Sequence, residues 1–161
     1  MLIDQQLLLD VSSGKLVQIE LPDLPNRYLE DTGYGYIVYS SYRDEDAGLS
    51  MLHIFRVDTE SGSLNEVLAQ RGVFRGFGFS MSGKTAYANY GEDPNHGAET
   101  LILFDFEDMS SRSLEDVLGE AFHELGGIVV RANWLSDNTL LLWVCSFVED
   151  RNVYNTWIAS W

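Results

Sequence analysis

Residues 52–64, LHIFRVDTESGSL, combine an apolar strand-like run with a turn that recurs elsewhere in the chain. The run ends at Val57 and is rich in residues that favour strands. The pattern D-x-x-x-G-x-L follows, with Asp58, Gly62 and Leu64. A short carboxylate can bond the neighbouring backbone and glycine accepts a positive φ, so the segment predicts a turn between two strands.

Two further copies of this pattern indicate that the chain is built from repeats. The copies place the same three positions at Asp10, Gly14 and Leu16 and at Asp108, Arg112 and Leu114, the last without the glycine. The three aspartates are 48 and 50 residues apart. A period of this length is typical of stacked supersecondary units. We therefore expect one domain over residues 1–161 with imperfect repeats at about 11–58, 59–108 and 109–161.

Two other signatures recur out of phase with the first. Residues 41–45, 89–93 and 146–150 each read serine or asparagine, an aromatic residue, any residue and two acids. Short turn sequences at residues 31–33, 81–83 and 136–138 precede the strand-like runs that end in these signatures. The expected strands cover residues 15–20, 34–41, 50–57, 64–69, 73–80, 84–90, 99–106, 127–135, 139–147 and 153–160. The prolines at 22 and 25 favour a loop before residue 31.

One segment has helical rather than strand periodicity. Ser113 precedes Asp116 by three residues, a spacing that resembles a capping box. Apolar residues then recur at helical spacing up to Leu125, and two glycines follow. We expect a short helix near 114–125 that takes the place of a strand and covers an exposed sheet edge.

Two segments are similar to part of a known repeat family. Residues 77–84, FGFSMSGK, and 132–139, ANWLSDNT, resemble the aromatic-Ser-x-Asp-Gly-Lys turn of TolB-type β-propeller blades, without its usual Pro-Asp-Gly core. The resemblance implies a mainly β fold of antiparallel four-stranded units in an open half-propeller-like array. Three units do not close a ring, so a homodimer that forms a six-bladed ring and a compact β-sandwich remain alternatives.

The charge balance limits the classes of partner. The chain has 10 Lys and Arg against 25 Asp and Glu, a net charge of −15. Such a charge repels nucleic acids and anionic membranes and attracts basic partners, so we expect no direct nucleic acid or membrane binding. Cys145 is the only cysteine, which fits a reducing compartment. With neither a basic N-terminal region nor a long apolar run, the sequence predicts a cytoplasmic protein.

Sequence motifs for catalysis or cofactor binding are absent. His53, His96 and His123 lack the spacing of metal ligands, and each is most simply structural or on the surface, although a site where they converge in space stays open. The sequence has no G-x-S-x-G nucleophile motif. Gly76 and Gly78 lie in a strand-like run and indicate close packing or a bulge. We expect no enzyme, no metal and no cofactor.

The repeated acids are the candidate partner-binding residues. They are Asp44, Glu45, Asp46, Glu92, Asp93, Glu149 and Asp150. Their equivalent repeat positions predict one negative surface on one rim of the array, while a solvated loop without a binding role is the simpler alternative. In size, acidity and lack of catalytic motifs the chain resembles bacterial immunity proteins, including those of contact-dependent growth inhibition systems.

The resemblance implies a module that binds and neutralises a basic nuclease toxin, because an acidic surface can compete for a phosphate-binding surface. Two alternatives stay open. The first is a propeller-like scaffold or oligomerisation module with no inhibitory role. The second is an enzyme or a sugar-binding protein that uses the many tyrosine and tryptophan side chains, although aromatic residues in strands more often pack within the sheet.

Overall fold

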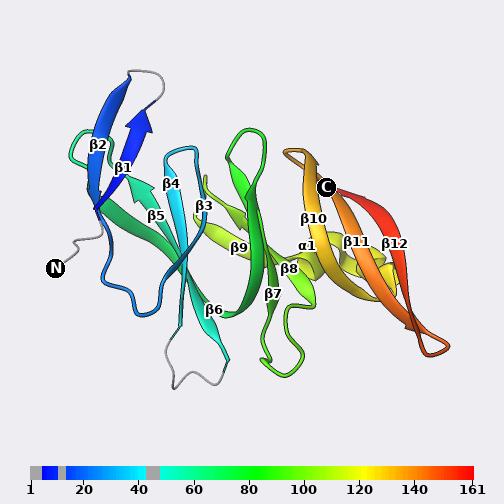
Figure 1. Ribbon diagram of the computed structural model, residues 1–161. Helices are drawn as coiled ribbons and strands as arrows, with labels where there is room; N and C mark the ends of the chain where they lie inside the picture. The colour runs from blue at the N-terminus through cyan, green and yellow to red at the C-terminus, as the bar shows by residue number, and fades with distance from the viewer. Residues whose placement is uncertain (1–4, 11–13, 43–47) are drawn as a thin grey trace.

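The chain forms an open array of antiparallel sheets, seen in the computed structural model for residues 5–10, 14–42 and 48–161 (Figure 1). The N-terminal hairpin pairs β1 (Gln5–Asp10) with β2 (Lys15–Glu20). The central sheet runs in chain order through β3 (Tyr28–Gly33), β4 (Tyr36–Tyr42), β5 (Ser50–Val57), β6 (Leu64–Phe79), β7 (Thr85–Gly91), β8 (Thr100–Asp105) and β9 (Ser110–Ser113). The C-terminal sheet holds β10 (Ile128–Ser136), β11 (Thr139–Val148) and β12 (Arg151–Ser160).

This architecture confirms the expected fold class: mainly β, antiparallel, open and with one short helical segment. Within each sheet, the strands that pair with each other are consecutive in the chain, as strands joined by short turns are. The sheets divide the chain differently from the sequence repeats. The borders expected at 58/59 and 108/109 fall within the β5–β6 and β8–β9 turns, inside the central sheet.

β6 differs from the two strands expected at 64–69 and 73–80. It is one strand of 16 residues, whose first half pairs with β5 and whose second half pairs with β7. The central sheet therefore consists of two four-stranded halves, β3–β6 and β6–β9, that share β6. Gly76 has φ +72° at the register shift between Arg75 and Phe77, which confirms the expected bulge.

The close-packing role expected of glycine in β6 also holds. A Cβ at Gly78 would lie 3.1 Å from the ring of Tyr87 on β7. At Gly72 it would lie 2.3 Å from the ring of Tyr90, on the same neighbouring strand. These glycines therefore let the rings of β7 lie directly on β6, and they do not end the strand.

Turn positions follow the sequence with one correction. Residues 31–33 belong to β3, and the turn to β4 is made by Tyr34 (φ +51°) and Gly35 (φ +82°), the left-handed pair that a two-residue hairpin requires. The turn at residues 81–83 is confirmed, with the Gly83 amide donating to the Ser80 carbonyl over 3.0 Å. Asp58 accepts from the Glu60 amide over 2.8 Å, as expected for an aspartate turn.

The expected helix is present as α1 (Leu114–Leu118) followed by the 3₁₀ helix η1 (Gly119–Leu125). Ser113 and Asp116 form the capping box reciprocally. The segment does not replace a strand, because β9 completes the central sheet before α1 begins. Instead of covering an edge, its buried Leu114 packs in the core between the central and C-terminal sheets.

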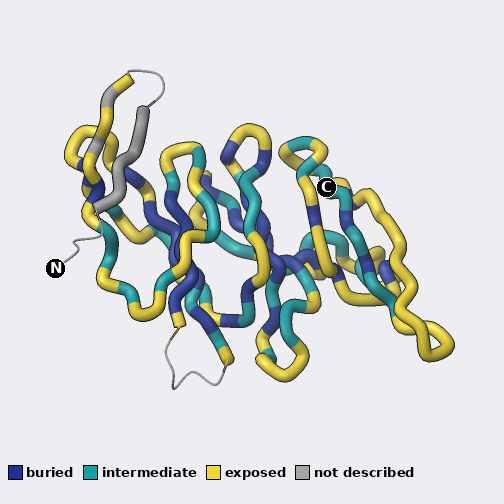
Figure 2. The backbone as a smooth tube through the Cα atoms, viewed as in Figure 1, coloured by how far each residue is buried: buried dark blue, intermediate teal, exposed yellow. Residues whose placement is uncertain are grey.

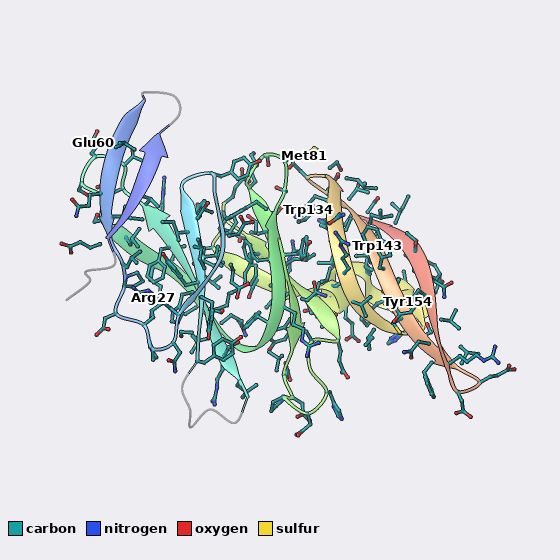
Figure 3. The ribbon with its side chains drawn as sticks, viewed as in Figure 1. Arg27, Glu60, Met81, Trp134, Trp143 and Tyr154 are labelled. Atoms are coloured by element: carbon teal, nitrogen blue, oxygen red, sulfur yellow. The ribbon has the colours of Figure 1, made fainter. Side chains whose placement is uncertain are left out.

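Three apolar clusters hold the layers together, and they lie in the interior strands (Figure 2). The first joins β2 to β4 and β5 through Ile19, Tyr39 and Phe55. The second packs the two halves of the central sheet against each other. The third joins β7 and β8 to the C-terminal sheet, with Trp134 between the two sheets (Figure 3). Successive sheets are therefore stacked face to face along the chain.

Candidate functional site

Three connections carry the repeated acids: β4–β5, β7–β8 and β11–β12. The β7–β8 and β11–β12 connections lie at the lower edge in Figure 1, where β4 and β5 also end, opposite the turns β3–β4, β6–β7 and β10–β11. Tyr42 and Tyr90 occupy the last paired positions before their connections, opposite Ser50 and Thr100. We call the acids of these three connections the acidic edge; its members are Asp44, Glu45, Asp46, Glu92, Asp93, Glu149 and Asp150.

The structure places four of these seven acids. Glu92, Glu149 and Asp150 are exposed, and Asp93 is half-buried. Asp44, Glu45 and Asp46 lie outside the described residues, although the ends of β4 and β5 that flank them are at the same edge. The acidic edge therefore contains solvent-facing carboxylates on two successive sheets.

Asp93 organises its own loop. Its Oδ1 accepts from the backbone amide and the side-chain amide of Asn95, each over 2.8 Å. These hydrogen bonds, together with the nearby His96, lower the pKa of Asp93 below 3.8 because they favour the charged form. His96 Nδ1 lies 3.5 Å from Asp93 Oδ2. One oxygen of the Asp93 carboxylate thus already accepts hydrogen bonds within its own loop.

Glu149 and Asp150 form the two-residue turn between β11 and β12. Both have left-handed backbone angles, with φ of +47° and +59°. Asparagine and glycine are the residues that usually supply this conformation at low cost. The adjacent Phe147 is 72 % exposed, so this turn presents two carboxylates beside a solvent-exposed aromatic ring.

A second constellation lies at the β4–β6 face, where sequence analysis expected no chemistry. Ser41 Oγ is 2.8 Å from His53 Nε2, and His53 Nδ1 is 2.6 Å from Glu66 Oε1. The three residues come from β4, β5 and β6, which are adjacent in the central sheet. Ser41 and His53 are buried, while the Glu66 side chain is 45 % exposed.

The carboxylate determines the direction of the hydrogen bonds. An ionised carboxylate only accepts, so His53 Nδ1 carries a hydrogen and donates it to Glu66. In the neutral imidazole the lone pair is then on Nε2, which accepts from the Ser41 hydroxyl. This network satisfies the polar atoms of two buried side chains, which would cost about 1–3 kcal/mol each without partners.

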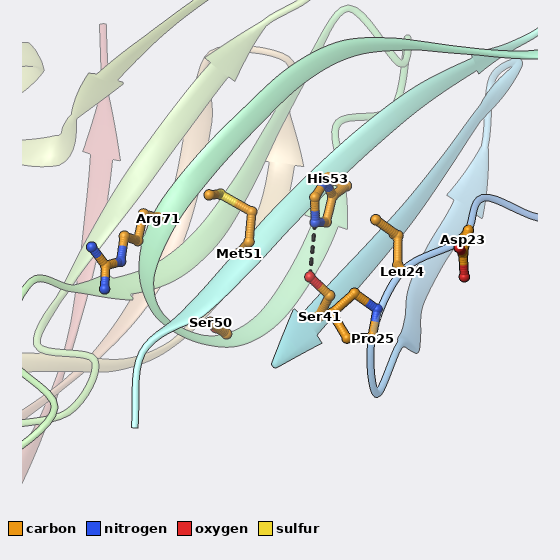
Figure 4. Close-up of a pocket in the computed structure, with 8 residues that line it drawn as sticks. All are labelled: Asp23, Leu24, Pro25, Ser41, Ser50, Met51, His53 and Arg71. Carbon is orange, nitrogen blue, oxygen red and sulfur yellow. Dashed lines mark hydrogen bonds between the residues drawn. The ribbon is translucent and has the colours of Figure 1, made fainter. Parts of the chain in front are cut away.

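A pocket opens beside Ser41 and His53 (Figure 4). Its volume is about 320 Å³, at the lower end of the range of small-molecule sites. Its walls come from the loop before β3 and from β4, β5 and β6; the lining residues are Asp23, Leu24, Pro25, Ser41, Ser50, Met51, His53 and Arg71. Arg71 lies at one end of the pocket and Asp23 at the other, with Ser41 between them.

No protein-family model matches this chain, and no curated protein matches it at a significant level.

The remaining candidate groups stay apart. His96 is in the β7–β8 loop and His123 is on η1, so the three histidines do not converge. Within residues 5–10, 14–42 and 48–161, no group of three or more histidine, cysteine, aspartate or glutamate side chains is arranged to hold a metal ion. No helix in this part of the chain has the length and apolarity of a membrane span.

The acids can be recognised in the sequence, but the network at Ser41 is not visible in any local motif. Its signal is the pairing of β4 with β5, which runs from Tyr36 opposite Arg56 to Tyr42 opposite Ser50. That register puts Ser41 and His53 in diagonal positions on one face. Glu66 joins them through a register shift between β5 and β6, which the sequence pattern does not indicate.

Proposed function

We propose that this chain is an acidic protein-binding module of the cytoplasm that acts as an immunity protein, binding and neutralising a basic nuclease toxin. One observation carries the proposal: the acidic connections β7–β8 and β11–β12 lie at one edge of the array, where β4 and β5, which flank the third group of acids in the sequence, also end. Acids that were scattered over the whole surface would contribute only to solubility. Acids that are concentrated at one edge form a negative surface that a basic partner can bind in one orientation.

The negative charge would act mainly on the rate at which the two proteins associate. A net charge of −15 attracts a basic partner from a distance and speeds association. At physiological salt, exposed charges more than about 8 Å apart are largely screened. The nuclease surface that holds phosphate is basic, so a bound acidic edge would exclude the nucleic acid from it.

Aromatic residues at the same edge would provide the lasting contact. Phe147 is 72 % exposed and lies two residues before Glu149, the first acid of the β11–β12 connection. Tyr42 is 36 % exposed at the end of β4, where its ring contacts Tyr28 at a centroid distance of 5.7 Å. Exposed aromatic side chains are common anchors in protein interfaces, since they bury a large area with few rotatable bonds.

The proposal is tested with a triple charge reversal, Glu92→Lys, Glu149→Lys and Asp150→Lys. Basic nuclease domains are sought among the products of the neighbouring genes, and binding kinetics are measured against them at about 50 and about 300 mM salt. We expect association at least about tenfold slower at low salt, with a smaller difference at high salt. Asp93 is left unchanged because it holds its loop.

A matched control changes the same net charge elsewhere. Glu60→Lys, Glu120→Lys and Glu124→Lys alter three exposed acids outside the acidic edge. If the control slows association as much as the edge variant, total charge and not the edge is responsible. If the edge variant also protects cells from the nuclease as well as the unchanged protein does, the inhibitory role of the edge is rejected.

A scaffold or oligomerisation module is the second candidate, favoured by the C-terminal sheet. β12 pairs only with β11 and is exposed along nearly its whole length. Tyr154 and Ile158 are 64 % and 67 % exposed on this strand. Sedimentation velocity separates the two functions: self-association that Ile158→Glu abolishes would support the scaffold.

A further inference from the structure

The pocket at the β4–β6 face contains a serine whose hydroxyl is bonded to an imidazole. We propose that Ser41 is a nucleophile for small carboxylic esters, with His53 as its general base and Glu66 as the residue that positions His53. This activity is independent of the acidic edge. It assigns chemistry to a pocket that the proposed binding function does not use.

The order of the hydrogen bonds is the order that nucleophile activation requires. Ser41 Oγ lies 2.8 Å from the unprotonated Nε2, so its proton has an acceptor within hydrogen-bonding distance. The carboxylate of Glu66 lies 2.6 Å from Nδ1 and would stabilise the imidazolium that forms when Nε2 takes the proton. The three groups are therefore arranged as nucleophile, base and orienting acid.

The sheet holds these groups in place. All three stand on adjacent strands in the interior of the central sheet, which position side chains more precisely than loops do. The His53 ring is stacked on Phe55, with centroids 6.1 Å apart and an interplanar angle of 18°. A ring fixed on both its edges and one face loses little freedom when a substrate binds, which favours reaction.

The pocket sets the class of substrate. A volume of about 320 Å³ admits a small ester and excludes a folded protein or a long acyl chain. Leu24, Pro25 and Met51 supply an apolar wall against which a short acyl group can pack. Arg71 and Asp23, which carry opposite charges, lie at the two ends of the pocket, so its lining does not favour one sign of substrate charge.

The reaction balances without a further reactant except water. Ser41 Oγ forms a bond to the acyl carbon as its proton passes to His53 Nε2. The bond from the acyl carbon to the alcohol oxygen breaks, and the proton on Nε2 goes to that oxygen. Water then attacks the acyl-serine with the same base, which releases the carboxylic acid and restores the Ser41 hydroxyl.

A second serine in the same pocket provides a matched control. The Ser50 hydroxyl donates to the Gly72 carbonyl over 3.0 Å, and the base in the network is bonded to Ser41 instead. Both serines are buried and line the pocket. They share an environment and differ in activation, so a selective reagent should distinguish them.

The test uses an alkyl fluorophosphonate and the full chain. Attack by Ser41 forms an O–P bond and breaks the P–F bond, so intact mass and peptide mapping report the modified residue. We expect stoichiometric labelling at Ser41, none at Ser50 in the same protein, and none in Ser41→Ala. His53→Gln should slow labelling about 100-fold or more, the usual contribution of a general base.

Glu66 is tested by a signal that depends on the position of the proton. In the unchanged protein, nitrogen NMR of the His53 ring should show the hydrogen on Nδ1. In Glu66→Gln the side-chain amide can donate to Nδ1, which moves the hydrogen to Nε2 and slows labelling. Circular dichroism and thermal unfolding establish that each variant is folded.

Three outcomes would overturn the proposal. One is that folded, unchanged protein does not react at Ser41 even with excess reagent. Another is that Ser50 and Ser41 react equally, and the third is that folded His53→Gln reacts as fast as the unchanged protein. In each of these cases the network is a buried polar contact that satisfies its own atoms and activates no nucleophile.

Discussion

Single side chains of β7 connect the central sheet to the C-terminal sheet. Tyr87 donates its hydroxyl to the Ala132 carbonyl, and Asn89 donates its side-chain amide to the Val129 carbonyl over 3.1 Å. Both donors are buried, so each replaces water at a backbone carbonyl of β10. Removing either donor would take away a buried hydrogen bond between the two sheets.

Tyr87→Phe should therefore lower the free energy of unfolding by about 1–3 kcal/mol, the range for an unsatisfied buried group. Tyr34→Phe is the matched control, because its exposed hydroxyl also donates to a carbonyl, that of Met81, over 2.8 Å. Water can replace that bond, so its loss should be smaller. Urea unfolding measures both variants, and equal losses would contradict a role for burial.

At this scale the sequence predicts turn residues well and the Ser41 network poorly. Asp58 and Gly62 are four positions apart and belong to the same turn, so their pattern can be recognised in the sequence. Ser41, His53 and Glu66 meet only when two strand registers are known, and one of those includes a bulge. Local patterns do not contain that information.

The apolar side chains of the α1–η1 segment differ in how far they are buried. Leu114 is fully buried in the core between the sheets, while Leu118 and Phe122 are partly buried against it. The capping box at Ser113 starts the segment, and its Asp116 has a pKa lowered by the hydrogen bonds from Ser113. The segment is thus anchored in the core at both ends, by Leu114 and by Leu125.

Leu114→Ala should cost about 2–5 kcal/mol of unfolding free energy, the range for a buried leucine. Phe122→Ala should cost less than the 3–5 kcal/mol of a fully buried aromatic, about 1–2 kcal/mol, because part of its ring already contacts water. Chemical denaturation compares the two variants. A larger loss for Phe122→Ala than for Leu114→Ala would contradict the smaller burial of Phe122.

The elements were predictable where periodicity and turn chemistry agreed. β5 and the helical segment occupy the residues expected for them. β6 was expected as two strands, 64–69 and 73–80, with a gap at residues 70–72 that contains Gly72. In the sheet Gly76 accommodates a bulge and Gly72 the ring of Tyr90, and the strand continues through them.

For the whole molecule, one carboxylate links two turns of different sheets. Asp137 in the β10–β11 turn accepts from the Ser82 amide over 2.8 Å. Hydrogen bonds from Ser82 are the main reason that the pKa of Asp137 is lowered below 3.8. The charged form is thus favoured in the folded protein, so the stabilisation is present above the unfolded pKa and is lost as pH falls through the folded pKa.

Asp137→Asn should therefore be less stable than the unchanged protein at pH 7, and the difference should shrink as the pH falls below about 4. Asparagine retains an oxygen acceptor, so the comparison isolates the charge. Thermal unfolding from pH 7 to about pH 2 measures the difference between the two proteins. A constant difference over this range would show that Asp137 does not titrate differently in the folded and unfolded chains.

The shared strand β6 has a consequence for how the molecule comes apart. Each half of the central sheet has β6 as one of its four strands. Unfolding of one half therefore removes hydrogen bonds from a strand that also belongs to the other half. The halves should therefore open and exchange their amide hydrogens as a single cooperative unit. In most stacked repeat proteins, neighbouring repeats are coupled mainly by packing between them. Here one continuous strand belongs to both halves, so partial unfolding that begins at this border should cost more free energy than unfolding that begins elsewhere.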